Sequence, residues 1–223
     1  KQEFNNYWFE TGTPTFLAEM LKNFKYRLPD LTKEQVTADV LNSIDSTSLN
    51  PVPIIYQSGY LTITGYNERF KRYRLGFPNK EVEEGFLNFL LPSYASVEAK
   101  SEFDIIEFVN DVETGNPQQF MERLRTLFAD TDYKIVGNAE LYFQNVLYLI
   151  FKIMSFYIQV ERPTANGRMD AIIQTADYVY IFECKLGKTA DEALRQIEDN
   201  AYARPFAMDR RKLFKIGVNF STK

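Results

Sequence analysis

Hydrophobic positions in the first part of the chain predict helices followed by a pair of strands. Thr13 and Pro14 supply an N-cap and a first-turn proline, and the apolar residues behind them recur at helical spacing. Farther on, β-branched and aromatic residues gather on both sides of a polar turn, as in a β-hairpin. The expected helices cover 13–23 and 32–44, and the expected strands cover 59–64 and 70–75. This order predicts a helical, winged-helix-like module.

A proline-containing segment, 92–96, breaks the helical pattern that precedes it. The helix before the break is expected over 79–91, and two more helices are expected over 102–111 and 117–128. The break predicts two domains, 1–95 and 96–223.

The last part of the chain has a more informative order of elements. An apolar helix leads into a strand, a hairpin follows, and a further helix precedes a final strand. The helices are expected over 138–155 and 190–203, and the strands over 157–162, 167–174, 178–186 and 213–220. The periodicity alone therefore predicts an αβββαβ core.

The hairpin carries the candidate chemistry. With its turn at Ala176 and Asp177, Asp170 falls directly opposite Glu183, where Cβ atoms lie about 4.5–5.5 Å apart on one face. Lys185, two residues beyond Glu183, emerges on that same face. Two carboxylates so placed repel each other unless a cation lies between them or one is protonated, or else the register differs. The alternative is an exposed ladder of charges at a sheet edge, and spacing alone leaves both interpretations open.

Composition narrows the chemistry. A chain of 223 residues with 45% hydrophobic residues can bury a full core. It has no histidine and one cysteine, which excludes Ser-His and Cys-His catalysis, the usual zinc ligand sets and an internal disulfide. Hydrolysis would have to depend on carboxylates, lysine and a hard cation such as Mg²⁺.

The charge pattern argues against a general coating of nucleic acid, because the formal net charge is −4. Two local basic clusters nevertheless exist, and each is open to two interpretations, a solvated surface or a contact surface. The clusters are Arg69, Lys71, Arg72 and Arg74, and Arg204, Arg210, Arg211, Lys212 and Lys215.

No apolar stretch is long enough to cross a bilayer, so no membrane association is expected and a cytoplasmic location is predicted. The chain begins at Lys1 without an initiator methionine or a signal pattern, and we expect it to be a piece of something longer.

Three short segments resemble motifs of the PD-(D/E)XK nuclease superfamily. These are Gly167-Arg168-Met169-Asp170, Ile181-Phe182-Glu183-Cys184-Lys185 and Ala193-Leu194-Arg195-Gln196-Ile197. The closer resemblance is to the nuclease-like module at the end of AAA-ATPase-like proteins of bacteria, and it extends to segments 7–14, 56–63 and 75–79. The resemblance implies a restriction-endonuclease-like core in 96–223, preceded by a region that follows an ATPase core.

The same resemblance implies roles for individual residues. Asp170 and Glu183 would hold Mg²⁺ or Mn²⁺, and Lys185 would be the catalytic lysine. Gln196 would support the site, and Glu140 would add an acidic group from the first core helix, although an acid in a first helical turn is also favourable without any such role. Nucleic acid, with DNA expected, would be the substrate.

Two alternatives to an active nuclease stay open. The nuclease fold could have become a catalytically inactive binding module, or the first domain could be the main functional part, contacting DNA or protein through its basic hairpin. The chain has no G-x-x-x-x-G-K-[ST] phosphate loop, so any ATPase activity would belong to a module upstream.

Overall fold

The computed structural model describes residues 13–43, 50–95, 104–129, 139–161 and 171–220. The chain divides into two compact units, Lys1–Tyr94 and Ala95–Lys223.

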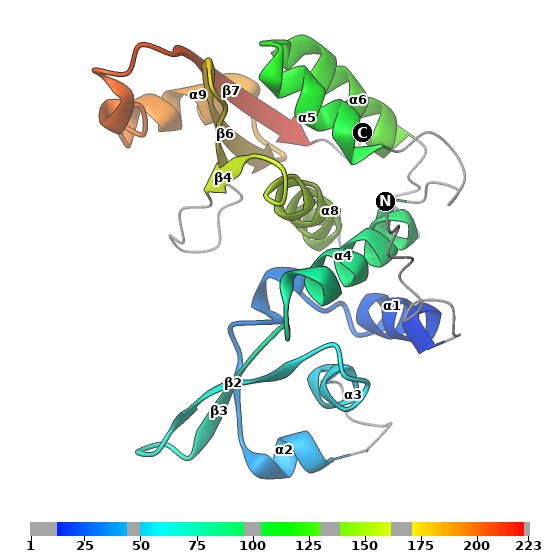
Figure 1. Ribbon diagram of the computed structural model, residues 1–223. Helices are drawn as coiled ribbons and strands as arrows, with labels where there is room; N and C mark the ends of the chain where they lie inside the picture. The colour runs from blue at the N-terminus through cyan, green and yellow to red at the C-terminus, as the bar shows by residue number, and fades with distance from the viewer. Residues whose placement is uncertain (1–12, 44–49, 96–103, 130–138, 162–170, 221–223) are drawn as a thin grey trace, which may run out of the picture. The chain divides into compact units, whose positions relative to one another are not determined.

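The N-terminal unit combines short helices with a three-stranded sheet (Figure 1). Its helices are α1 (Thr13–Asn23), α2 (Ala38–Asn42), α3 (Val52–Gln57) and α4 (Lys80–Ala95), and a 3-10 turn covers Leu28–Asp30. Its strands are β1 (Gln35–Val36), β2 (Thr62–Asn67) and β3 (Arg72–Gly76), in the order β1-β3-β2. The expected hairpin is present as β2 and β3, while the winged-helix assignment remains a prediction.

Two predictions in this unit were wrong. The helix expected over 32–44 is replaced by β1 and the short α2, because Gln35 and Val36 pair with Arg74 and Tyr73 of β3. Tertiary pairing here overrides a helical spacing of apolar residues.

The break expected at Pro92 does not occur, since α4 continues through it to Ala95. Leu90 and Leu91 before Pro92, and Tyr94 after it, are buried. Their burial offsets the backbone hydrogen bond that proline removes.

The C-terminal unit is a four-stranded mixed sheet between helices (Figure 1). Its helices are α5 (Ile105–Glu113), α6 (Pro117–Ala129), α8 (Ala139–Met154) and α9 (Ala190–Asp199), and a 3-10 turn covers Arg204–Phe206. Its strands are β4 (Gln159–Glu161), β5 (Ala171–Gln174), β6 (Tyr178–Leu186) and β7 (Lys212–Phe220). The predicted αβββαβ order from α8 to β7 is confirmed, although α9 is shorter than the expected 190–203.

The sheet order is β4-β5-β6-β7, with antiparallel pairing up to β6 and parallel pairing of β6 with β7. The parallel pair needs a crossover connection, and α9 supplies it. The two long strands, β6 and β7, therefore lie side by side, with β7 at one end of the strand order.

Helices cover both faces of the sheet. On one face, the Tyr180 hydroxyl donates a hydrogen bond of 2.8 Å to the Val112 carbonyl of α5, and the Phe182 ring contacts Phe120 of α6 and Phe151 of α8. The helix α8 is buried along most of its length, as expected for one that is apolar on nearly all sides.

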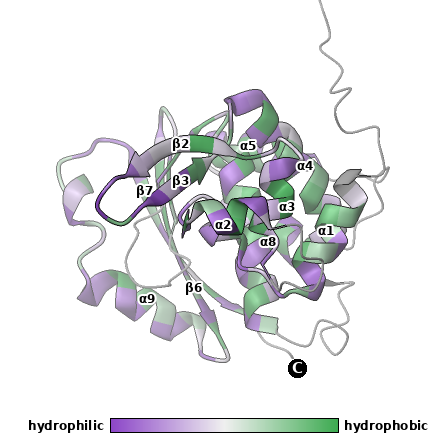
Figure 2. Ribbon diagram, turned by 90° about the horizontal axis from the view of Figure 1, so that it is seen from below, coloured by the Kyte–Doolittle hydropathy of each residue, from purple (hydrophilic) through white to green (hydrophobic). Residues whose placement is uncertain are grey.

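The helix α9 packs on β6 and β7 on the other face. Figure 2 shows hydrophilic and hydrophobic residues alternating around it, consistent with one face on the sheet and one in solvent. None of the helices in the part of the chain that the structure describes is long and apolar enough to cross a membrane.

Candidate functional site

The register of the β5–β6 hairpin is the one that the turn at Ala176 and Asp177 predicts. Ala171 pairs with Phe182, Ile172 with Ile181, and the pairing continues to Gln174 with Val179. One more step of the same register would place Asp170 opposite Glu183. Asp170 lies outside the described residues, so its place in the site remains a prediction.

Glu183 and Lys185 form a buried ion pair within β6. The Glu183 side chain is fully buried, the Lys185 side chain is 12% exposed, and the Lys185 ammonium donates a hydrogen bond to Oε1 of Glu183. The two residues are two positions apart on a strand, so this contact confirms that they project from one face.

The second carboxylate oxygen of Glu183 differs from Oε1 in its hydrogen bonding. Oε2 is buried and has no hydrogen-bond partner among the described residues. A buried charged oxygen without a partner is costly, and such atoms are rare in proteins. Glu183 therefore has one oxygen satisfied by lysine and one able to accept a further ligand.

The helix α9 lies on the face from which Glu183 projects. Glu183 is level with Gly217 of β7, and in a parallel pair such residues point to the same side. A Cβ at Gly217 would lie 2.4 Å from the carbonyl oxygen of Ala190, the first residue of α9. Lys215, on the same side of β7, pairs with Glu198 of α9 at 2.6 Å. Glycine at position 217 thus lets the helix begin directly against the sheet beside Glu183.

A capping box fixes where α9 begins. The Glu192 backbone N–H donates to Oγ1 of Thr189 at 3.1 Å, and the Thr189 N–H donates to the Glu192 carboxylate at 2.9 Å. The N–H of Thr189 lowers the pKa of the Glu192 carboxyl below its usual range, helped by the Thr189 hydroxyl. This cap sets the rotation of the helix about its axis, and so which residues face the sheet.

Gln196 lies on the sheet-facing side of α9. Ala193 and Ile197, at helical spacing around it, are fully buried. Its Nε2 is buried and has no hydrogen-bond partner among the residues described. Gln196, which the sequence analysis named as a supporting residue of the site, thus has a buried amide donor that is able to bind a further group.

Glu140, unlike Glu183 and Gln196, has an exposed side chain. It is exposed in the first turn of α8, and its Oε1 accepts a hydrogen bond of 3.1 Å from Nε2 of Gln144. Within the described ranges, no group of three or more Asp, Glu, His or Cys side chains could hold a metal ion. Because Asp170 is outside those ranges, the predicted ligand set of Asp170, Glu183 and Glu140 stays a prediction.

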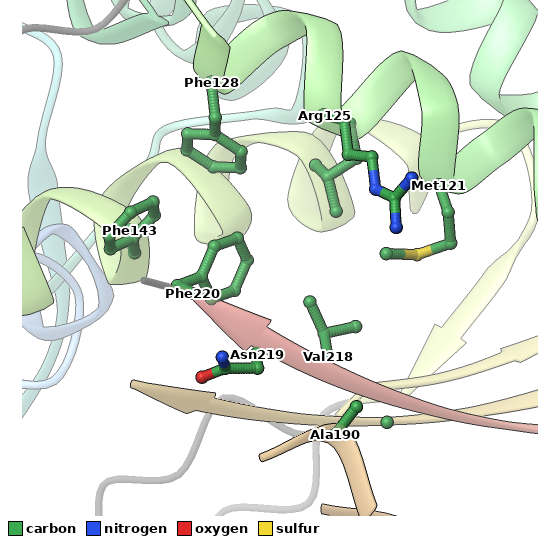
Figure 3. Close-up of a pocket in the computed structure, with 10 residues that line it drawn as sticks. Met121, Arg125, Phe128, Phe143, Ala190, Val218, Asn219 and Phe220 are labelled. Atoms are coloured by element: carbon green, nitrogen blue, oxygen red, sulfur yellow. The ribbon is translucent and has the colours of Figure 1, made fainter. Parts of the chain in front are cut away.

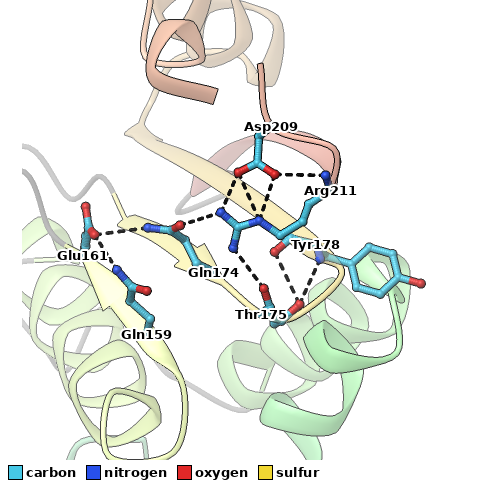
Figure 4. Close-up of polar contacts among 7 residues, drawn as sticks. All are labelled: Gln159, Glu161, Gln174, Thr175, Tyr178, Asp209 and Arg211. Atoms are coloured by element: carbon cyan, nitrogen blue, oxygen red, sulfur yellow. Dashed lines mark hydrogen bonds and ion pairs between the residues drawn. The ribbon is translucent and has the colours of Figure 1, made fainter. Parts of the chain in front are cut away.

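A polar network ties the opposite end of the hairpin to the start of β7 (Figure 4). The Arg211 guanidinium donates to Asp209, to the Thr175 carbonyl at 3.0 Å and to Oε1 of Gln174 at 2.8 Å. The Gln174 amide donates in turn to Glu161 of β4 at 3.1 Å. Hydrogen bonds from Arg211 lower the pKa of Asp209 to about 2.

Sequence reasoning grouped Arg211 with a basic cluster and missed this clamp. The available signal was the acid at 209, two residues before the arginine. In the structure the network orders β4, β5 and β7 relative to one another. It therefore supports the sheet without contacting the Glu183 end of β6.

A pocket of about 420 Å³ lies along β7 (Figure 3). Its walls are apolar side chains of α6 and α8 together with Arg125, and Ala190 and residues 217–220 of β7 form the floor. Asn219 in that floor is level with Lys185 on the neighbouring strand. Neither Glu183 nor Lys185 lines the pocket, although Gly217 in its floor is level with Glu183.

Comparison with known proteins gives two matches of different extent. The chain is 32% identical over 241 residues to a protein of Azotobacter chroococcum mcd 1 described as "Uncharacterized protein in vnfD 5'region". The match covers 99% of this chain and 45% of that relative, so the chain spans about half of the relative's length. No solved structure matches the chain.

The second match concerns the C-terminal segment. Residues 138–223 match the family model described as PD-(D/E)XK nuclease superfamily. That segment begins at the start of α8 and includes β4, β5, β6, α9 and β7, which are the elements that hold Glu183, Lys185 and Gln196. By this match, the αβββαβ part of the chain is similar to the PD-(D/E)XK nuclease superfamily.

Proposed function

We propose that the C-terminal unit is a metal-dependent nuclease that hydrolyses phosphodiester bonds in DNA. The observation that carries the proposal is the Glu183 carboxylate, buried beside the Lys185 ammonium with one oxygen unoccupied. The match of residues 138–223 to a nuclease superfamily supports it independently.

The residues fit a hard divalent cation. Oxygen ligands suit Mg²⁺ and Mn²⁺, and the unpartnered Oε2 of Glu183 is an oxygen that such an ion would satisfy. Asp170 would be the second ligand, because the observed register leads to the position opposite Glu183, and Glu140 would be a third acidic group. When bound, the ion would polarise the scissile phosphate and make a water molecule a better nucleophile.

Lys185 would act on the attacking water and the phosphate through the charge of its ammonium group. Its ammonium is held by Glu183 and is only slightly exposed, so its charge is not screened as it would be on a free surface. From there it can orient the attacking water and stabilise negative charge that develops on the phosphate. The Gln196 amide, a donor without a partner among the residues described, would hold a water molecule or a phosphate oxygen.

The test is cleavage by the purified chain in the presence of Mg²⁺ or Mn²⁺. Labelled single-stranded DNA, double-stranded DNA and RNA would be supplied separately, and products resolved on denaturing gels. We expect DNA cleavage that EDTA stops and that Lys185→Ala removes. Lys188→Ala is the matched control, since Lys188 is an exposed lysine just beyond β6. Cleavage that persists in Lys185→Ala would reject the assigned site.

The alternative is a catalytically inactive nuclease fold that binds nucleic acid or protein. The observation that favours it is that Glu183 already has a counter-charge within the chain, the Lys185 ammonium. Titration calorimetry with Mn²⁺ separates the two proposals. Heat that disappears in Glu183→Gln supports the nuclease, and an absence of heat together with absent cleavage supports the binding module.

The domain organisation of the full-length protein is also a proposal. The chain covers 45% of its relative from Azotobacter chroococcum, so that relative carries additional sequence. We infer an ATPase module upstream in the full-length protein, with the N-terminal unit following it as a winged-helix-like connection. Sequencing the complete gene would test this, because a G-x-x-x-x-G-K-[ST] loop before Lys1 is the expected result.

A further inference from the structure

The β2–β3 hairpin of the N-terminal unit carries exposed cations and aromatic rings that the proposed nuclease site does not use. We call Tyr66, Arg69, Phe70, Lys71, Arg72 and Arg74 the hairpin patch. All six side chains are exposed, with Phe70 60% and Tyr66 48% accessible. Figure 2 shows the turn of the hairpin as strongly hydrophilic.

The geometry of the hairpin presents these side chains along a narrow ribbon. Asn67 pairs with Arg72 and Tyr66 with Tyr73, so residues 68–71 form the turn. Asn67 Oδ1 accepts a hydrogen bond of 3.2 Å from the Phe70 N–H, which holds the turn closed. Arg72 and Arg74 alternate with Tyr73 and Leu75, so both arginines project from one face of β3.

The cations of the patch have no carboxylate partner within the described residues. This distinguishes them from the C-terminal basic cluster, where Arg211 is bonded to Asp209 and Lys215 to Glu198. In the patch, Arg72 donates a hydrogen bond of 3.1 Å to the Gln35 carbonyl, and the Arg69 guanidinium lies over the Phe70 ring. Glu68, also in the turn, is the acidic residue of this segment, so the local charge stays positive.

Aromatic side chains stand among these charges. The Phe70 ring lies at the turn with Arg69 at 5.2 Å from its centroid, and the Tyr66 and Tyr73 rings contact each other at 4.8 Å. An exposed phenylalanine at a hairpin turn is unusual in a surface that has only to be solvated. Cations that neutralise phosphates, beside rings on which bases stack, are the two components of single-strand recognition.

We propose that the hairpin patch binds single-stranded nucleic acid. Its cations contact the phosphates, and Phe70 and Tyr66 offer surfaces to unstacked bases. A duplex would use the cations but leave the rings without bases, and an anionic membrane would require a larger apolar face than this ribbon provides. The proposal concerns binding by the N-terminal unit and does not depend on cleavage by the C-terminal unit.

The test is fluorescence anisotropy with the whole chain in EDTA, so that metal-dependent cleavage does not interfere. The probes are a labelled oligothymidylate, a duplex of mixed sequence and vesicles containing anionic lipid. Three variants are compared: Arg69→Gln with Lys71→Gln, Phe70→Ala, and the charge-matched control Lys33→Gln with Lys80→Gln. Circular dichroism melting establishes that each variant is folded.

We expect the double turn variant to bind the oligothymidylate about tenfold more weakly and to lower the salt slope by about 1.4, since each single-strand phosphate contact contributes about 0.7. Phe70→Ala should weaken binding about fivefold or more, because stacking accounts for a large part of affinity for single strands. The lysine control should bind like the unmodified chain.

Several outcomes would overturn the proposal. They are equal binding by the turn variant and the control, no effect of Phe70→Ala, a preference for duplex over single strand, or binding to vesicles without binding to the oligonucleotide. Loss of cleavage in Lys185→Ala with unchanged anisotropy would leave the proposal standing. Failure of the nuclease proposal is therefore distinguishable from failure of this one.

Discussion

Lys185 neutralises Glu183 from two positions along the same strand; near the end of β6, the Glu183 side chain is fully buried and the Lys185 side chain is mostly buried. Burying two charges is costly, and the attraction between them offsets this cost only while both are present. Glu183 therefore needs a positive neighbour in the folded state, whether lysine alone or lysine with a metal ion.

Replacing Lys185 by methionine should destabilise the unit by about 3–5 kcal/mol, because a buried carboxylate loses its counter-charge. The measurement is urea unfolding followed by circular dichroism in EDTA. The double variant Glu183→Gln with Lys185→Met should be more stable than Lys185→Met alone. Equal stabilities of these two would show that the pair is not coupled.

A divalent metal ion should stabilise the unmodified chain by binding to Asp170 and Glu183. We expect Mn²⁺ to raise the melting temperature of the chain, with a smaller rise in Asp170→Asn and in Glu183→Gln, because binding to the folded state alone adds to its stability. Differential scanning fluorimetry with and without EDTA measures this. A full rise in Asp170→Asn would exclude Asp170 as a ligand.

The Tyr180 hydroxyl joins β6 to α5, outside the segment that matches the nuclease superfamily model. Tyr180→Phe should lower the free energy of unfolding by about 0.5–1.5 kcal/mol, the usual contribution of one hydrogen bond. Tyr178→Phe on the same strand is the matched control and should cost less. An equal loss in both would mean that packing, and not the bond to Val112, is responsible.

Gly217→Ala should separate α9 from the sheet. The new Cβ would lie 2.4 Å from the backbone oxygen of Ala190, and backbone cannot rotate away as a side chain can. We expect a loss of about 1–3 kcal/mol, as for other overpacked sites, with reduced cleavage because α9 carries Gln196. Unfolding and gel assays measure the two effects. Unchanged stability would contradict the close approach.

The Arg211 clamp should give a distinct acid dependence. The pKa of Asp209 is lowered from its ordinary value of 3.8 to about 2 by Arg211, so its stabilising effect is complete above about pH 4. That effect should be lost as the pH falls toward about 2, where Asp209 becomes protonated in the folded state too. Urea unfolding of Asp209→Asn and the unmodified chain should therefore differ at pH 5 and converge by about pH 2. A constant difference would exclude the linkage.

Much of the C-terminal unit could be predicted from local patterns. The order of elements from α8 to β7 followed from periodicity, and the hairpin register followed from the position of a two-residue turn. The common face of Glu183 and Lys185 was equally predictable, because alternation along a strand requires no information from other segments.

Tertiary contacts account for the errors in the N-terminal unit. Segment 32–44 has apolar residues at helical spacing, yet β3 offers a strand edge with which Gln35 and Val36 pair. Pro92 looks like a break in the sequence, yet the buried residues on both sides of it keep α4 intact. In both cases distant residues supply the free energy that local propensity lacks.

The sequence by itself determined that an acid and a lysine share one face of β6, because backbone geometry fixes side-chain direction within a strand. Only the tertiary structure decided that this face is covered by α9, that Glu183 is buried with one unpartnered oxygen, and that Arg211 belongs to a clamp. These properties depend on which surfaces exclude water, and that is decided by segments far apart in the sequence that pack together, not by any local pattern.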